Sequence, residues 1–98
     1  MIRSFRGQAT EDIFDGKNSK IARKLCSRSI WKIAARKLEQ IDSIVSLDDL
    51  KVPPGNRLEA LEGDRAGQYS IRINDQYRVC FSWDDGYADN VEIVDYHQ

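Results

Sequence analysis

The stretch "GQYSIRINDQYRVCFSW", residues 67–83, decides the fold of this chain. Tyr69, Ile71 and Ile73 alternate with polar residues, and after "NDQ" the apolar residues again occupy every second position up to Trp83. A period of two is typical of strands that bury one face of a sheet. The stretch therefore predicts a β-hairpin with one apolar face and one more polar face.

The length of the hairpin loop fixes which residues face each other. A three-residue loop over 74–76 sets Ile71 opposite Val79 and keeps the apolar side chains together. A two-residue loop would shift the register by one and place Arg78 among the isoleucines, which would lose the buried face. The longer loop is therefore predicted, and it sets Arg72 directly opposite Arg78.

Two arginines at facing positions repel each other and destabilise a sheet. One interpretation is that nearby carboxylates neutralise them, and the candidates are Glu59, Glu92 and Asp95. The other is that the guanidinium groups of Arg72 and Arg78 converge on an anion, most naturally a phosphate. The spacing alone favours neither interpretation.

The segments before the hairpin predict helices. Residues 28–45 repeat apolar side chains every three or four positions, as expected of an amphipathic helix: Trp31, Ala34, Leu38, Ile41 and Val45. "MIRSF" suggests a first strand, Thr10 can cap a brief helix that Gly16 ends, and Ser46 with Asp49 resembles a capping box. Strand, helices and then strands predict an α+β fold with an antiparallel sheet, as one domain over residues 1–98.

Composition narrows the class of protein. With 41% hydrophobic and 32% charged residues the chain suits a soluble globular domain, and no apolar run is long enough to span a membrane. Cys26 and Cys80 lie far apart, which predicts free buried thiols in a reducing, cytoplasmic environment. Two thiols and one histidine fall short of a four-ligand zinc site, so no metal is expected.

The charge is unevenly distributed along the chain. Residues 1–45 hold ten Lys or Arg against five Asp or Glu, whereas residues 46–98 hold five against eleven. The basic half is either a solvated helical face or a patch that recognises phosphate or an acidic partner.

The end of the chain, "NVEIVDYHQ", contains the single histidine, His97, after Asp95 and Tyr96. Its β-branched residues predict a last strand near 91–97, beside residues 77–83. If this strand ends near the arginine pair, the sheet gathers an anion clamp, a phenol and an imidazole. Such a set suits metal-free cleavage of an RNA phosphodiester, although a terminal histidine can equally be an exposed bystander.

Three segments taken together resemble the HigB toxins, the host-inhibition-of-growth or plasmid-maintenance killer proteins of the RelE/ParE superfamily. They are "MIRSF", "PPGNRLEALEGDRAGQYSIRINDQYRVCFSW" and "VEIVDYH", in that order. The resemblance implies a compact, microbial-RNase-like RelE fold in which N-terminal helices pack on a curved antiparallel sheet. It also implies a toxin of a type II toxin–antitoxin system that enters the A site of the 70S ribosome and cleaves mRNA there without a cofactor.

The same resemblance implies partners and residue roles. A helix-turn-helix antitoxin similar to HigA would hold the toxin inactive, and the complex would bind operator DNA through the antitoxin. Arg72 and Arg78 would bind the reacting phosphate, and Asp95, Tyr96 and His97 would complete the site. Lys51, Arg57 and Arg65 would contact the RNA backbone.

The chain departs from some HigB members at one position that matters for catalysis. Where they read "H-P-L-K-G", this chain reads "EALEG", so Glu59 is either a general base or only a counter-charge. Two alternatives stay open: the superfamily resemblance also allows a ParE-like poison of DNA gyrase on the same fold, and the basic helical face allows a non-catalytic protein-interaction module.

Overall fold

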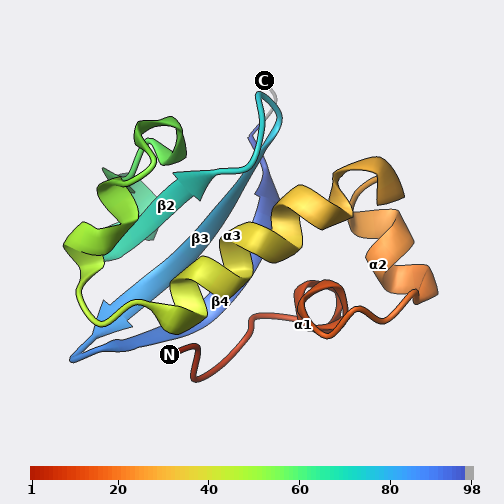
Figure 1. Ribbon diagram of the computed structural model, residues 1–98, viewed down its shortest axis with the longest axis horizontal. Coiled ribbons are helices and arrows are strands. Elements are labelled where there is room, and N and C mark those ends of the chain that lie inside the picture. Colours follow the sequence, from red (N-terminus) through yellow and green to blue (C-terminus); the bar gives the residue numbers. More distant parts are fainter. Residues whose placement is uncertain (97–98) are drawn as a thin grey trace.

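A computed structural model describes residues 1–96 of the chain and places helices on one face of an antiparallel sheet (Figure 1). The sheet has four strands in the order β1-β2-β3-β4, so each strand lies beside its neighbour in sequence. The predicted α+β fold is confirmed. The helices are α1 (Gln8–Phe14), α2 (Lys20–Leu25) and α3 (Trp31–Ser43), and the strands are β1 (Glu59–Ala60), β2 (Gln68–Arg72), β3 (Tyr77–Asp84) and β4 (Tyr87–Asp95).

The hairpin of β2 and β3 has the predicted register. Ile71 pairs with Val79, and Arg72 pairs with Arg78. The side-chain oxygen of Asn74 accepts hydrogen bonds from the backbone N–H groups of Gln76 and Tyr77, at 2.9 and 2.8 Å, and so holds the three-residue loop. The cross-strand arginine pair is therefore a feature of the fold.

The α3 helix confirms the amphipathic pattern but is shorter than predicted. It begins at Trp31, after a single 3₁₀ turn over Arg28–Ile30, because the chain at Cys26 and Ser27 is extended. It ends at Ser43, and Val45, which we expected on the apolar face, is 85% exposed. Short 3₁₀ turns follow at Leu47–Lys51, Pro54–Asn56 and Gly63–Arg65. At the first of these, the Ser46 N–H donates to Asp49 Oδ2 at 3.1 Å, as in the predicted capping box.

The N-terminal segment differs from the prediction in two ways. It forms no full strand; instead Ile2 and Phe5 make isolated parallel bridges to Ala88 and Val91 of β4. Between these two partners Asn90 adopts a positive φ of 52°, which interrupts the ladder. Thr10 does not cap α1, which begins two residues earlier. It lies buried within the helix, where its hydroxyl accepts a hydrogen bond from the Ile93 N–H at 3.1 Å.

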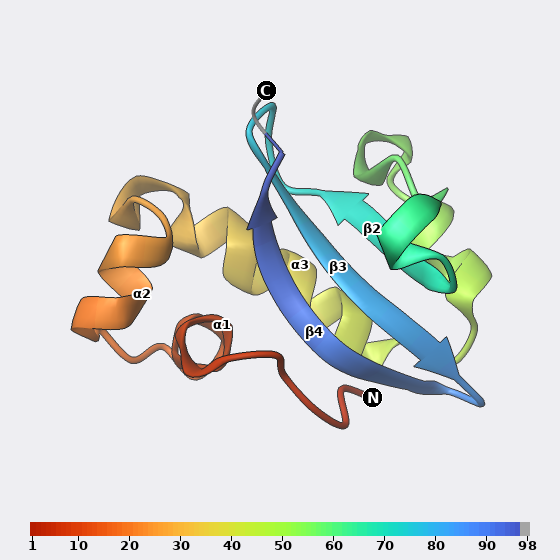
Figure 2. The same ribbon diagram turned by 180° about the vertical axis from the view of Figure 1, so that it is seen from behind.

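The core lies between the helices and one face of the sheet. Leu38 of α3 and Ile71, Val79 and Phe81 of the hairpin are fully buried in it. The last strand begins at Tyr87, earlier than predicted, because Asp85 and Gly86 both have positive φ and close a tight turn that pairs the ends of β3 and β4. Viewed from behind, the opposite face of the sheet carries no α-helix (Figure 2). We call this second surface the open face.

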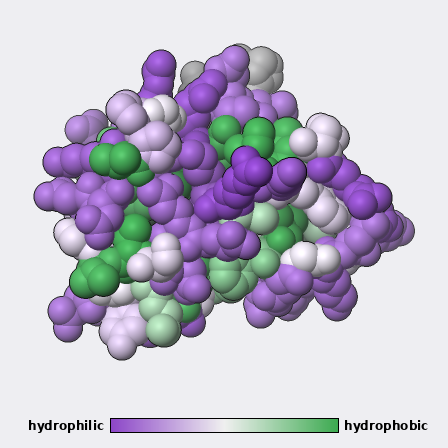
Figure 3. Space-filling view, in the orientation of Figure 1, coloured by the Kyte–Doolittle hydropathy of each residue, from purple (hydrophilic) through white to green (hydrophobic). Residues whose placement is uncertain are grey.

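The helical side is largely hydrophilic, with separate apolar patches (Figure 3). Both cysteines are free and buried, as predicted. None of the helices in residues 1–96 has the length and apolar character that crossing a bilayer requires.

Candidate functional site

The open face carries two rows of side chains that cross the sheet. Strand pairing aligns the first row from β1 to β4: Glu59, Ser70, Cys80 and Glu92. The second row consists of Arg72, Arg78 and Val94. Because alternate residues of a strand share a face, the apolar partners in the core leave these polar side chains together on the other side.

Arg78 is the most enclosed charged side chain of this face, with 8% of the residue exposed. Its Nε donates to Ser70 Oγ at 2.8 Å, and its Nη2 donates to the carbonyl of Arg57 at 2.6 Å and to that of Ser70 at 3.3 Å. Glu59 lies 3.8 Å away, beyond hydrogen-bond distance. Neutral oxygens therefore orient the guanidinium group without cancelling its charge.

Arg72 is held differently from its partner. Its guanidinium binds Asp75 in the hairpin loop, whereas that of Arg78 reaches along the sheet to Ser70. The two groups thus have separate acceptors, which relieves the repulsion that the register alone predicts. Removing Arg78 would leave the buried Ser70 hydroxyl without this partner, so an alanine at position 78 should not stabilise the fold even though it relieves the repulsion.

Tyr96 covers the arginine from the end of β4. The Arg78 guanidinium lies 5.7 Å from the centre of the Tyr96 ring, a cation–π distance. Burial raises the pKa of the Tyr96 phenol, and the nearby arginines offset this only in part. Burial likewise raises the pKa of the Cys80 thiol, which interacts with Tyr96. Both groups are therefore neutral near neutral pH, and the phenol keeps a proton to donate.

The remaining predicted acid–base residues are divided among different locations. Glu59 is half exposed on the open face, 3.8 Å from Arg78. Asp95 pairs with Tyr77, so the alternation of β4 directs it to the helical face, where it accepts from Gln76 Nε2 at 3.2 Å. His97 lies outside the described residues. The structure therefore brings Glu59 and Tyr96 to Arg78 and separates Asp95 from it.

The three residues predicted to bind RNA also differ in their surroundings. Lys51 is exposed and pairs with Asp48 at 3.4 Å. Arg57 has an exposed side chain and a positive φ of 47°, and its backbone carbonyl, rather than its side chain, contacts Arg78. Arg65 reaches the open face, where it pairs with Glu92 at 2.7 Å.

Sequence reasoning missed two residues that shape the site. Ser70 is fully buried and fixes Arg78, and its place on the polar face of the predicted hairpin is the signal that could have pointed to it. Asn56 is also fully buried; its amide nitrogen donates to Gln40 Oε1 at 3.0 Å and to the Leu50 carbonyl at 3.1 Å. Asn56 thereby fixes the position of Arg57, and no sequence pattern marks it for that purpose.

Comparison with known proteins identifies the family of the chain. Residues 3–97 match the model of the family described as "RelE-like toxin of type II toxin-antitoxin system HigB". The chain belongs to the HigB family. It is thus a toxin of a type II toxin–antitoxin system, and the resemblance seen in its sequence motifs is confirmed.

One named relative supports the family assignment, and an uncharacterised protein is also similar in sequence. The chain is 49% identical to Toxin HigB-1 of Vibrio cholerae over 67 residues, which cover 68% of this chain and 70% of that protein. It is 38% identical over 63 residues to an uncharacterised protein of Haemophilus influenzae, covering 64% and 62% of the two chains.

Solved structures share the fold of this HigB-family toxin. YoeB in the YoeB–YefM complex of Staphylococcus aureus superposes with a TM-score of 0.62 at 23% identity, over 100% of this chain and 97% of that one. The YoeB dimer of the same organism gives a TM-score of 0.59 at 22% identity, over 99% and 95% of the chains. The microbial-RNase-like RelE fold, with its curved antiparallel sheet, is therefore confirmed.

Proposed function

We propose that this toxin is a ribosome-dependent endoribonuclease that cleaves mRNA in the ribosomal A site and so stops translation and growth. The observation that carries the proposal is the Arg78 guanidinium, which is nearly buried, oriented by neutral oxygens and covered by a tyrosine. A preorganised cation of this kind stabilises charge that develops during a reaction far better than a flexible surface arginine does. The family assignment and the polar residues that strand pairing aligns on the open face support the same conclusion.

The reaction is one displacement at phosphorus that is accompanied by two proton transfers. A base removes the proton from the 2′-hydroxyl, and the resulting oxygen attacks the adjacent phosphorus. The P–O5′ bond then breaks, and an acid gives a proton to the leaving 5′-oxygen. The products are a 2′,3′-cyclic phosphate and a free 5′-hydroxyl. Arg78, assisted by Arg72, stabilises the negative charge on the phosphorane, which is a role that metal ions fill in other nucleases.

The acid and the base are assigned from position and protonation. Tyr96 is the candidate acid, because its raised pKa keeps the phenol protonated and its ring lies against Arg78. Glu59 is the candidate base, because it is the carboxylate that lies closest to Arg78 on the open face. His97 is a further candidate for either role. Asp95 lies on the helical face of the sheet, so it influences the reaction only through neighbouring residues.

The ribosome supplies what the isolated toxin lacks. The chain has a net charge of -1 and few acid–base groups, so free RNA binds it weakly. Positioning mRNA for in-line attack is worth several kcal/mol, and the ribosome provides that positioning. Lys51, Arg57 and Arg65 contact the RNA backbone; Arg65 does so by exchanging Glu92 for phosphate. A HigA-like helix-turn-helix antitoxin holds the toxin inactive and carries the complex to operator DNA.

The test uses purified ribosomes programmed with a defined mRNA. Wild-type toxin should cleave the A-site codon, and Arg78→Ala should not, while neither protein should cleave the same mRNA without ribosomes. Circular dichroism and thermal unfolding establish that the variant is folded. Undiminished cleavage by folded Arg78→Ala would overturn the assignment, and gyrase-dependent DNA breaks in place of mRNA fragments would favour the gyrase-poison alternative.

A further inference from the structure

Lys37 differs from the other basic residues of the helical layer. Residues 17–37 contain eight Lys or Arg and no Asp or Glu, and seven of those eight side chains are exposed. Lys37 alone is half-buried, and its ammonium group donates a hydrogen bond to Oδ1 of Asn56. No carboxylate of residues 1–96 forms an ion pair with it. An ammonium group has three donors, so Lys37 keeps both its charge and its capacity to bind an anion.

Lys37 comes from the helical layer, but its charge interacts with that of Arg72 in the arginine pair. Burial lowers the pKa of Lys37, and the nearby charge of Arg72 lowers it further. Asn56, which holds Lys37, precedes Arg57, whose carbonyl holds Arg78 at 2.6 Å. Two consecutive residues therefore orient two cations, and the third, Arg72, lies directly opposite Arg78 in the sheet.

At this edge of the sheet β2 is bordered by the 3₁₀ turn Pro54–Asn56 rather than by a continuing strand. The short strand β1 pairs only with Tyr69 and Ser70 of β2, so within residues 1–96 no strand continues beside Arg72. A ligand bound on the open face can therefore extend past this edge of β2. Lys37 is placed to meet it from the helical side.

The local counter-charges are fewer and weaker than the cations. Arg72 pairs with Asp75, whose side chain is 99% exposed, and Arg78 lies 3.8 Å from Glu59, whose side chain is 54% exposed. Because the carboxylate of each pair is solvated, another anion can replace it. Three cations against two solvated carboxylates leave an excess of positive charge at this end of the sheet.

We infer that Lys37 and Arg72 form a second anion subsite, which binds the RNA phosphate next to the one held by Arg78. The identification of that anion as an RNA phosphate rests on the proposed function; the subsite itself rests on the three cations and their shared support. It extends the site around the edge of β2, and it makes Lys37 a binding residue that the sequence did not indicate.

The test measures binding of an uncleavable RNA rather than activity. The probe is an RNA trinucleotide with a 2′-deoxy centre, titrated into the full-length toxin at several salt concentrations and followed by NMR. Lys37→Gln keeps a neutral donor for Asn56 but removes the charge, and Lys32→Gln removes the same charge from an exposed position of the same helix. We expect Lys37→Gln to weaken binding by about 3- to 10-fold and to reduce the slope of log K against log salt by about 0.7. Lys32→Gln should change neither.

Two further variants make the result decisive. Lys37→Arg should restore the salt slope of the wild type, and Arg72→Gln should reduce it by the same amount as Lys37→Gln. A wild-type slope in both Lys37→Gln and Arg72→Gln would overturn the subsite. Ribosomal cleavage by the wild type is a separate readout: if the wild-type toxin does not cleave mRNA on programmed ribosomes while Lys37→Gln weakens trinucleotide binding, the subsite stands and the nuclease proposal fails.

Discussion

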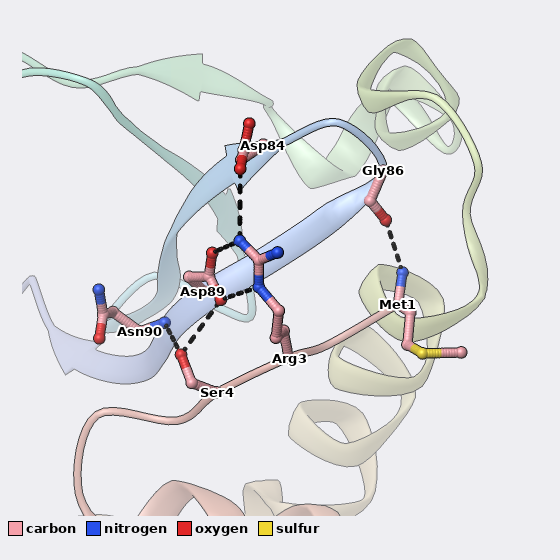
Figure 4. A network of polar contacts seen from close by, with 7 residues as sticks. All are labelled: Met1, Arg3, Ser4, Asp84, Gly86, Asp89 and Asn90. Atoms are coloured by element: carbon pink, nitrogen blue, oxygen red, sulfur yellow. Dashed lines mark hydrogen bonds and ion pairs between the residues drawn. The ribbon is translucent and has the colours of Figure 1, made fainter.

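Arg3 and Arg78 lie near opposite ends of β3, and each guanidinium covers a tyrosine ring. Arg3 lies 4.8 Å from the ring of Tyr87, and Arg78 lies 5.7 Å from that of Tyr96. Their polar partners, however, are of different kinds. Arg3 donates to both carboxylate oxygens of Asp89 and lies 3.4 Å from Asp84, in a clasp that also ties the Met1 ammonium group to the Gly86 carbonyl (Figure 4). Arg78 donates to a hydroxyl and to carbonyl groups.

The difference separates a structural arginine from a functional one. The carboxylates of Asp84 and Asp89 neutralise Arg3 and fasten the N-terminal segment to the β3–β4 turn. Neutral oxygens fix Arg78 equally well but leave its positive charge to be used by a ligand. We therefore expect changes in the N-terminal clasp (Met1, Arg3 and Ser4 with Asp84, Gly86, Asp89 and Asn90) to affect stability, and changes around Arg78 to affect cleavage.

The same substitution at the two arginines should give the largest contrast. Arg78→Lys keeps the charge but loses the forked donors that reach Ser70 and Arg57, so ribosome-dependent cleavage should fall by ~10²–10³-fold. Arg3→Lys should leave cleavage per folded molecule unchanged and lower the thermal midpoint by about 2–6 °C. Cleavage assays and thermal unfolding of both variants check this, and equal losses of cleavage would refute the distinction.

The two tyrosines offer a smaller but sharper comparison. Tyr96→Phe keeps the ring over Arg78 and removes only the phenolic proton donor, so cleavage should fall by ~10²-fold. Tyr87→Phe makes the same change beside Arg3 and should have no effect. Rates on programmed ribosomes measure both. If Tyr96→Phe cleaves at the wild-type rate while His97→Gln does not, the acid is the imidazole and the phenol only packs.

The smallest expected effect is the pH dependence of stability that comes from the N-terminal clasp. The hydrogen bond from Arg3 lowers the pKa of Asp89, so the folded state favours the ionised carboxylate. Its contribution to stability is present above the unfolded aspartate pKa of about 3.9 and is lost as pH falls through the lower folded pKa.

Thermal midpoints of wild type and Asp89→Asn, measured from pH 7 down to pH 2, test this expectation. The wild type should be more stable at pH 5–7, and the difference should shrink below about pH 4. In an Arg3→Gln background the same comparison should be nearly flat, because the hydrogen bond that shifts the pKa is gone. A difference that persists at pH 2 would rule out the carboxylate as its source.

Sequence reasoning succeeded where the pattern is local and failed where it depends on neighbours in space. The alternation around residues 67–83 gave the hairpin, because a buried face tolerates only one register. The adjacent letters of Asp95 and Tyr96 suggested a joint site, yet neighbouring residues of a strand point to opposite faces. Asp95 therefore belongs to the helical side, whereas Tyr96 reaches Arg78.

The sequence by itself determined that Arg72 and Arg78 face each other, because strand periodicity and loop length allow a single alignment. It also carried the motifs that identify the HigB family. Only the tertiary structure decided which arginine keeps its charge for a ligand. That choice depends on the Arg57 carbonyl, the Ser70 hydroxyl and the approach of Lys37 to Arg72, which the packing of α3 and the 3₁₀ turns against the sheet brings together.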